Sequence, residues 1–278
     1  MSHVLGIIAG GGELPRAIAQ SARDAGRKVH ILAVKGSTDE GWLAEFPHDW
    51  MTLGEWGLSV RLLSAAGAKE VVLVGRVDRP TLSEIKFDPK GLMILPSLVA
   101  AARKGDDAML KVTSDFFTRE GFSVLSAVEA APGLVIAEGA LGKLKPNADQ
   151  QDDIARAFAI IRALGTLDVG QAAIVCDGLP LCVEAAEGTD AMIARVGTLR
   201  KNLHGTPSRK RGVLAKALKA TQDRKTDLPV IGVETARCVH AVGLAGIALE
   251  AGACLILGKG EVAAESDKLG LFVIGVRL

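Results

Sequence analysis

The first half of the chain alternates short apolar runs with segments whose apolar residues recur at helical spacing. The runs at residues 4–9 and 29–34 are rich in Val, Ile and Leu, as is typical of strands buried on both faces. Strands that alternate with helices predict a parallel, doubly wound sheet of the Rossmann type. The expected strands are residues 4–9, 29–34, 70–74 and 122–128, and the expected helices are residues 15–25, 60–66 and 106–121.

The second half begins again with a helix and continues with strands that include an antiparallel pair. Asp177-Gly178 separates two apolar runs, and this dipeptide is typical of a tight hairpin turn. The pattern predicts a second α/β domain with a mixed sheet. The expected strands are residues 171–176, 181–185, 212–216, 228–232, 254–257 and 271–274; helices are expected at residues 151–164, at residues 191–199 and from Thr235, and residues 241–257 are interpreted as a buried helix that runs into a strand.

Gly, Lys and Pro accumulate between the two halves, around Pro132 and over residues 139–146. Such composition is typical of the segment that joins two domains. We therefore expect a Rossmann-like N-terminal domain at residues 1–133 and a C-terminal α/β domain at residues 134–278.

Composition narrows the class of protein. The 278 residues are 49% hydrophobic, contain 32 glycines and lack tyrosine, which favours α/β packing over an aromatic-rich all-β sandwich. The net charge of +1 creates no overall field for nucleic acid or membrane, and no apolar run reaches the roughly 18 residues of a membrane span. Four cysteines without C-x-x-C spacing are interpreted as buried thiols of a cytoplasmic protein: Cys176, Cys182, Cys238 and Cys254.

The turn Gly10-Gly11-Gly12 joins an apolar strand to a helix. The N–H groups and dipole of a helix N-terminus attract anions, and glycines let a phosphate approach the backbone. A dinucleotide site needs a third glycine where Pro15 stands, and an acidic residue after the second strand, where Lys35 stands. We favour contact with a phosphate or a sugar nucleotide over a purely structural turn, and both over a dinucleotide site.

Two aspartates, Asp106 and Asp107, follow Lys104-Gly105 at the start of an expected helix. One aspartate is enough to cap the helix, so the other is available to a ligand. The sequence leaves capping and ligand contact equally open here.

Three carboxylates, Glu184, Glu187 and Asp190, gather around Gly188-Thr189. One interpretation is purely structural: Thr189 or Asp190 caps the helix that follows. Carboxylates beside an apolar strand are costly unless something pairs with them, and a hard cation such as Mg²⁺ is one natural partner.

The segment at residues 200–225 carries nine lysines and arginines. A solvated face, a phosphate site and contact with an anionic membrane surface all remain open. Nucleic acid is disfavoured, because no aromatic residues interleave with the charges for base stacking. Lys216 differs from the others, since it ends the apolar strand at residues 212–216 and is therefore fixed in place.

A loop before the strand at residues 228–232 combines two acids with two bases. It contains Gln222, Asp223, Arg224, Lys225 and Asp227. Cleavage of a pyrophosphate requires a metal on the phosphate oxygens, a carboxylate that holds the metal or orients water, and cations that stabilise the leaving phosphate. The loop offers residues of the required types.

In combination, these motifs give the chain a resemblance to the LpxI-type UDP-2,3-diacylglucosamine pyrophosphatases of lipid A biosynthesis. The most specific strings are E-x-x-E-G-T-D-A-M at residues 184–192 and D-L-P-x-I-G at residues 227–232. The resemblance spans nearly the whole chain; its other matching segments are residues 6–12, 14–15, 75–77, 79–80, 104–108 and 167–171.

The resemblance implies Mg²⁺-dependent hydrolysis of UDP-2,3-diacylglucosamine to UMP and 2,3-diacylglucosamine 1-phosphate, by two domains that enclose the substrate. Asp227 matches the family's essential carboxylate, and we expect it to act as a metal ligand or to orient water. We further expect Lys216 and Glu187 to be catalytic and Asp190 to bind the metal. Arg76 departs from the family pattern, in which a small polar residue stands there.

The residues expected to bind the substrate are Gly10, Gly11, Gly12, Arg76, Lys104, Asp106, Asp107, Gln171, Gly188, Thr189, Gln222 and Thr235. A lipid-bearing substrate and the basic segment together predict transient, peripheral contact with the anionic inner face of the inner membrane. A homodimer stays open. The alternatives are a non-catalytic protein that binds a sugar nucleotide or lipid, and, less favoured, an NAD(P)-dependent oxidoreductase.

Overall fold

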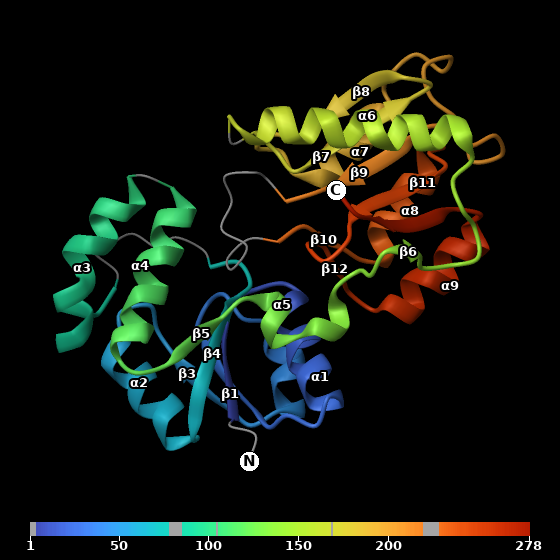
Figure 1. The fold of residues 1–278 in the computed structure, drawn as a ribbon. Helices are drawn as coiled ribbons and strands as arrows, with labels where there is room; N and C mark the ends of the chain where they lie inside the picture. Colours follow the sequence, from blue (N-terminus) through green and yellow to red (C-terminus); the bar gives the residue numbers. More distant parts are fainter. Residues whose placement is uncertain (1–3, 78–84, 104, 168, 219–227) are drawn as a thin grey trace. The chain divides into compact units, whose positions relative to one another are not determined.

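Two units with separate cores make up the chain in the computed structural model, one ending at Gly133 and the other beginning at Leu134. The structure describes residues 4–77, 85–103, 105–167, 169–218 and 228–278. Figure 1 shows the sheet of each unit with its own set of helices. Each unit is therefore considered by itself.

The first unit is built on five parallel strands in the order β3-β2-β1-β4-β5. Placing β1 between β2 and β4 reverses the direction of winding at the centre of the sheet, which is the doubly wound arrangement expected from the sequence. Its strands are β1 (Val4–Ala9), β2 (Val29–Val34), β3 (His48–Met51), β4 (Ala68–Val74) and β5 (Ser123–Leu125). Its helices are α1 (Leu14–Asp24), α2 (Trp56–Ala65), α3 (Pro89–Ala102), α4 (Asp106–Arg119) and α5 (Ala127–Ala130), with 3₁₀ turns at Glu40–Glu45 and Pro132–Leu134.

The second unit contains a six-stranded mixed sheet in the order β6-β13-β11-β9-β7-β8, and β10 pairs with β12 separately. The central strands β9, β11 and β13 are parallel, whereas β7 runs antiparallel to β9 and to β8. Its strands are β6 (Gly139–Ala140), β7 (Ala172–Cys176), β8 (Leu179–Val183), β9 (Val213–Lys216), β10 (Val230–Ile231), β11 (Gly246–Glu250), β12 (Leu255–Ile256) and β13 (Phe272–Val276). Its helices are α6 (Ala148–Gly165), α7 (Thr189–Val196), α8 (Val233–Ala241) and α9 (Lys259–Leu269). Both sheets confirm the α/β class and the mixed second sheet.

Two hydrophobic clusters fill the second unit, one on each face of its sheet. Residues of α7, α8 and α9, such as Met192, Val239 and Val262, pack on one face. Residues of α6, such as Phe158, pack on the other. The sheet is therefore covered by three helices on one side and by α6 on the other (Figure 1).

One expected element is wrong. Residues 241–257 do not form a helix that runs into a strand, because the structure has the strand β11 at Gly246–Glu250. This strand lies between β9 and β13 and is buried over Gly246–Leu249, so both of its faces are apolar. A run without polar alternation carries no periodicity that distinguishes strand from helix.

No helix within the described ranges combines the length and the apolar character that crossing a membrane requires.

Candidate active site

Polar residues from four strands meet at one edge of the six-stranded sheet. Lys216 ends β9 and pairs in register with Ala172, which begins β7. Gln171 immediately precedes β7, and Glu250 ends the parallel strand β11. Glu184 follows β8, and its backbone N–H donates to the carbonyl of Ala172 at 2.9 Å. The topology thus gathers a lysine, a glutamine and two glutamates at the carboxyl ends of the parallel strands.

Lys216 is a buried cation, with 3% of its surface exposed. Its Nζ donates to Thr189 Oγ1 at 2.8 Å and to the carbonyl of Val230 at 3.2 Å. A buried ammonium group is costly unless acceptors and a counter-charge surround it. The side chain is therefore fixed in position by the fold, as the sequence predicts from its place at the end of an apolar strand.

Thr189 connects Lys216 to Glu184 by hydrogen bonds. Thr189 Oγ1 donates to Glu184 Oε1 at 2.5 Å, while it accepts from Lys216. A hydroxyl has one proton to donate, so Thr189 accepts from Lys216 and donates to Glu184, and thereby links the two side chains. Glu184 Oε2 accepts the backbone N–H of Gln171 at 3.0 Å, which fixes the other side of the carboxylate.

Gly170 allows the backbone N–H of Gln171 to reach the carboxylate of Glu184. Its φ is +57°, and a Cβ at this position would lie 2.0 Å from the carbonyl oxygen of Glu184. Only glycine has the conformational freedom and the small size for this close approach. The local sequence Gly170-Gln171 is thus tied to the position of the buried carboxylate.

Gln171 also carries a buried acceptor. Its Oε1 is inaccessible to solvent and has no hydrogen-bond partner within the described part of the chain. Buried polar atoms nearly always have a partner, so an unsatisfied one indicates a missing donor. A donor group of a bound ligand would satisfy it.

The carboxylates of the E-x-x-E-G-T-D segment separate into different environments. Glu187 Oε1 pairs with Arg195 Nη2 at 3.0 Å, and the same guanidinium donates to the carbonyl of Val183. Asp190 is exposed in the first turn of α7 and has no hydrogen bond or ion pair with other described residues. Asp190 is thus better placed than Glu187 to hold an external cation.

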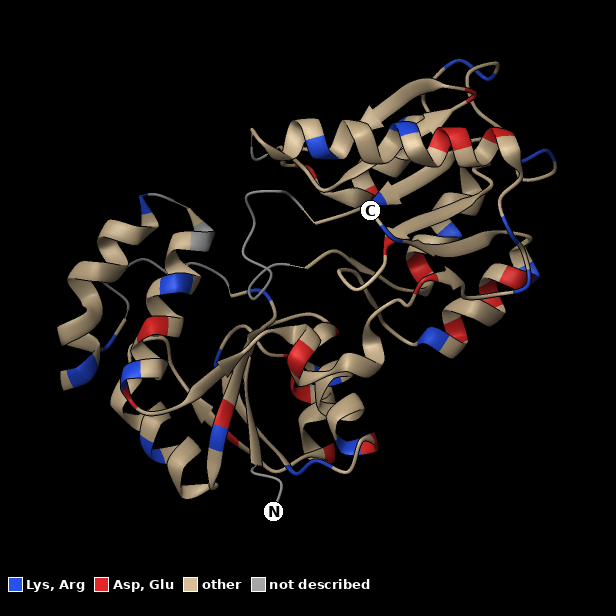
Figure 2. Cartoon of the chain, in the orientation of Figure 1, with Lys and Arg blue, Asp and Glu red and all other residues tan. Residues whose placement is uncertain are grey.

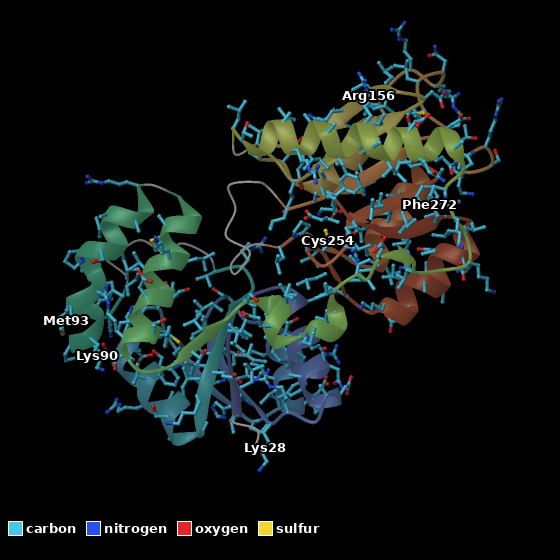
Figure 3. The ribbon with its side chains drawn as sticks, viewed as in Figure 1. Lys28, Lys90, Met93, Arg156, Cys254 and Phe272 are labelled. Carbon is cyan, nitrogen blue, oxygen red and sulfur yellow. The ribbon has the colours of Figure 1, made fainter. Side chains whose placement is uncertain are left out.

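The thiols near the site are held in their neutral form. Burial raises the pKa of the Cys254 thiol to about 12, partly opposed by a backbone hydrogen bond from Glu250 and by the charge of Lys216. Its Sγ donates to the carbonyl of Lys216 at 3.5 Å, and Figure 3 labels Cys254. Burial, and secondarily the charge of Asp190, raises the pKa of the Cys238 thiol. These cysteines are therefore structural thiols and unsuited to act as nucleophiles.

The segments on either side of residues 219–227 are anchored at the same edge. The N–H of Leu218 donates to Glu250 Oε2 at 3.0 Å, and the carbonyl of Val230 accepts from Lys216. Leu228 is buried. Asp227 and Gln222 themselves lie outside the described residues.

Thr235 lies at the third position of α8 and is 9% exposed. Its Oγ1 accepts the backbone N–H of Gly232 at 3.4 Å. This contact gives Thr235 a role at the helix N-terminus that needs no ligand.

The glycine turn of the first unit packs against the end of β4. The N–H of Gly10 donates to the carbonyl of Val74 at 2.8 Å, and that of Gly11 donates to the carbonyl of Arg76 at 2.7 Å. A Cβ at Gly10 would lie 2.5 Å from the Arg76 carbonyl oxygen. The N–H groups of these two glycines therefore serve the close approach of two loops, so a ligand that contacts Gly10 or Gly11 would do so without those N–H groups.

Gly12 is the member of the turn with room around it. Its φ is +91°, and a Cβ there would meet no atom within 4 Å. The side chain of Arg76 is exposed at the end of β4. The N-cap position of α4 is occupied by Gly105, so neither aspartate stands at the capping position that the sequence offered them. Lys104 and the side chains of Asp106 and Asp107 lie outside the described residues, so their contact with a ligand stays a prediction.

A divalent metal fits the donor set at the sheet edge only in part. Within the described ranges there is no group of three or more His, Cys, Asp or Glu able to hold a metal. Mg²⁺, however, usually keeps several waters and binds through one or two carboxylates together with substrate phosphates. Asp190 is one such carboxylate among the described residues.

Sequence reasoning did not identify the hydrogen-bonded connection from Lys216 through Thr189 to Glu184. The sequence shows Glu184 as one of three neighbouring acids, but nothing in it indicates that Glu184 is linked to a lysine 32 positions later. The available signal was the glutamate at the end of a strand in an otherwise apolar environment.

Comparison with known proteins covers both units. The family model of the LpxI N-terminal domain matches residues 4–134, and that of the LpxI C-terminal domain matches residues 137–274. A curated relative from Caulobacter vibrioides, "UDP-2,3-diacylglucosamine pyrophosphatase LpxI", is 44% identical over 272 residues, which cover 98% of this chain and 97% of the relative.

Among solved structures, N5-carboxyaminoimidazole synthase from Aspergillus clavatus aligns with 76% of this chain and 46% of its own. The identity is 13% and the TM-score is 0.24. A likeness this weak carries no argument about fold or function.

Proposed function

Because the chain belongs to the LpxI family, we propose that it hydrolyses the pyrophosphate of UDP-2,3-diacylglucosamine in lipid A biosynthesis, releasing UMP and 2,3-diacylglucosamine 1-phosphate. The observation that carries this proposal is the 44% identity to a named pyrophosphatase over 98% of the chain. The protein is accordingly an enzyme of the hydrolase class.

The arrangement around Lys216 suits the charge that this reaction develops. Hydrolysis of a diphosphate builds negative charge on the attacked and leaving phosphates, and positive groups fixed beforehand stabilise it. Lys216 is such a group, because Thr189 and Val230 hold its ammonium at the sheet edge. The first turn of α7 adds backbone N–H groups and the positive end of a helix dipole.

Asp190 and Asp227 are proposed to hold Mg²⁺, with Asp227 also orienting the attacking water. When bound, the metal neutralises phosphate oxygens and lowers the pKa of its water. Asp190 is exposed in the first turn of α7, and Asp227 stands three positions before Val230, whose carbonyl binds Lys216. Glu187 is already paired with Arg195, so its proposed contribution is to position the loop that precedes α7.

Substrate contacts are proposed for residues of both units. Gln171 offers a buried, unsatisfied acceptor to a hydroxyl or N–H of the substrate. The remaining proposed contacts are Gly188, Thr189, Gln222 and Thr235 in the second half of the chain, and Gly10, Gly11, Gly12, Arg76, Lys104, Asp106 and Asp107 in the first.

We also propose a cytoplasmic enzyme that contacts the anionic inner face of the inner membrane transiently. Support comes from α3, whose Leu92 and Met93 are 58% and 81% exposed. Lys90 is the only charged residue of this helix, and Figure 2 shows α3 as largely uncharged. Exposed apolar side chains next to basic ones are typical of surfaces that bind anionic lipid.

Product analysis tests the proposed reaction. The purified protein is incubated with UDP-2,3-diacylglucosamine and Mg²⁺, and the products are identified by mass spectrometry. We expect UMP and 2,3-diacylglucosamine 1-phosphate in equal amounts, and loss of both when EDTA is added. Binding of intact substrate without turnover would favour the non-catalytic alternative, and undiminished turnover in EDTA would contradict the metal.

A further inference from the structure

The second unit contains a groove on the α6 side of its sheet. It has a volume of about 670 Å³, which falls within the roughly 300–1,000 Å³ typical of small-molecule sites. Ile154 and Phe158 of α6 form one wall, and Ile274 and Val276 of β13 form the other. The groove exists because α6 packs on β7 and β9 and leaves part of β13 beside it uncovered.

One face of α6 lines the groove along most of the helix. The lining positions Gln151, Ile154, Ala155, Phe158, Ala159 and Arg162 follow a spacing of three and four residues. Eleven residues separate the first from the last, which corresponds to about 16 Å of helix. Ala155 and Ala159 are exposed and small, so they leave the space open. The shape is that of an elongated, apolar trough.

The trough runs from one edge of the sheet to the other. Asp153 near the start of α6 accepts the N–H groups of Asp177 and Gly178, which form the turn after β7. This contact places the first turns of α6 at the edge opposite Lys216. At the other end, Val276 of β13 pairs in register with Glu250 of β11. The preceding residue of β11, Leu249, pairs with Lys216 of β9. The trough therefore ends, on the α6 face, at the same edge of the sheet whose opposite face holds Lys216 and Thr189.

The charges of the lining are positive. Arg162 and Arg277 lie toward the end of the trough at the sheet edge that Lys216 shares, and Lys145 precedes α6 at the far end. Among the described lining residues no side chain is acidic. Arg277 pairs with Glu138 at 2.9 Å, but both side chains are mostly exposed and such pairs are weak. An apolar trough with cations at its ends suits a hydrocarbon chain attached to an anionic head.

We propose that this trough binds one acyl chain of the lipid-bearing substrate, with the chain lying between α6 and β13 and its sugar head at the Lys216 edge. The assignment rests on the proposed function. Figure 3 labels Phe272 on β13 and Arg156 on α6, the two elements that would enclose the chain. Arg162 and Arg277 would add positive charge where the chain joins the phosphorylated sugar.

Filling the trough tests the proposal. We compare the wild-type enzyme with Ala159→Trp, which fills the trough, and with Ala163→Trp, an exposed alanine of the same helix outside the lining. Each is assayed on the long-chain substrate and on an analogue with two acetyl groups. We expect Ala159→Trp to lower kcat/KM for the long-chain substrate by about tenfold or more, since loss of two or three buried methylenes has that effect. Its kcat/KM for the diacetyl analogue should stay within about twofold of wild type.

Other outcomes separate this assignment from the proposed function. An equal loss on both substrates, or the same discrimination in Ala163→Trp, would overturn the assignment of the trough. So would tight binding of a free fatty acid in the trough without any dependence of kcat/KM on chain length. Absence of wild-type turnover on both substrates would instead contradict the proposed function. Ala155→Trp repeats the test at a second exposed lining position.

Discussion

At the residue scale, the candidate site depends on Lys216, a basic side chain that the fold holds in one position. Lys216 is buried, and two of its N–H groups bind Thr189 and Val230. Its position at the end of an apolar strand is visible in the sequence. Its partners are not, because Glu184 and Thr189 come from another strand and helix and meet it only through the sheet topology.

Lys216→Met should reduce turnover of the diphosphate by about 10²–10³-fold, because a fixed group that stabilises developing negative charge is lost. The same change leaves the partly buried carbonyl of Val230 and the hydroxyl of Thr189 without their donor, which should cost about 1–3 kcal/mol of stability. Turnover by mass spectrometry and unfolding in urea measure the two effects. Lys201→Met, at an exposed lysine, is the control. Turnover of Lys216→Met within threefold of wild type would remove Lys216 from the mechanism.

At the scale of elements, the sequence predicts best where the local signal is strong. The hairpin around Asp177-Gly178 is confirmed, because β7 and β8 pair on either side of it with φ angles of +50° and +75°. The first strand, the glycine turn and α6 also follow clear patterns. By contrast, β11 was misread, since a strand buried on both faces shows no alternation. Helix α3 was not predicted at all; Pro96 lies inside it, and proline ordinarily argues against a helix interior.

Asp153 is a buried residue that links α6 to the turn between β7 and β8. Its two carboxylate oxygens accept the N–H groups of Asp177 and Gly178 at 3.0 and 2.7 Å. Asp153→Ala should lower the free energy of unfolding by about 2–4 kcal/mol, because two hydrogen bonds to a charged acceptor are lost and the turn is left unsatisfied. Asp152→Ala, at the exposed neighbouring position, should change it by no more than about 0.5 kcal/mol. Equal effects of the two variants in urea unfolding would show that the contact contributes no stability.

The exposed face of α3 leads to a prediction about membranes. Figure 3 labels Lys90 and Met93, both on α3. The double variant Leu92→Ser/Met93→Ser should sediment with anionic vesicles about tenfold less strongly than wild type, since large apolar side chains supply membrane-binding free energy when buried. Leu167→Ser, at a leucine that is 72% exposed in the other unit, is the control. Vesicle binding that is unaffected by the double variant, or equally strong to neutral vesicles, would contradict this role of α3.

At the scale of the whole molecule, two α/β units with separate cores carry the family's N- and C-terminal domains. Fold class and family could be read from the sequence, because glycine turns, buried strands and the strings around Glu184 and Asp227 are local features. The trough beside α6 could not, since its walls are 112 or more positions apart in the sequence and meet only when β13 takes its place in the sheet.

The proposed reaction depends most on Asp227, which should be indispensable for turnover of the substrate but not for substrate binding. The measurement is release of UMP from UDP-2,3-diacylglucosamine by wild type and Asp227→Asn, with substrate affinity determined by calorimetry on the same preparations. We expect wild-type enzyme to release UMP and Asp227→Asn to bind the intact substrate with little or no release. Release at the wild-type rate by Asp227→Asn would contradict the proposal that this carboxylate makes the diphosphate bond cleavable by water.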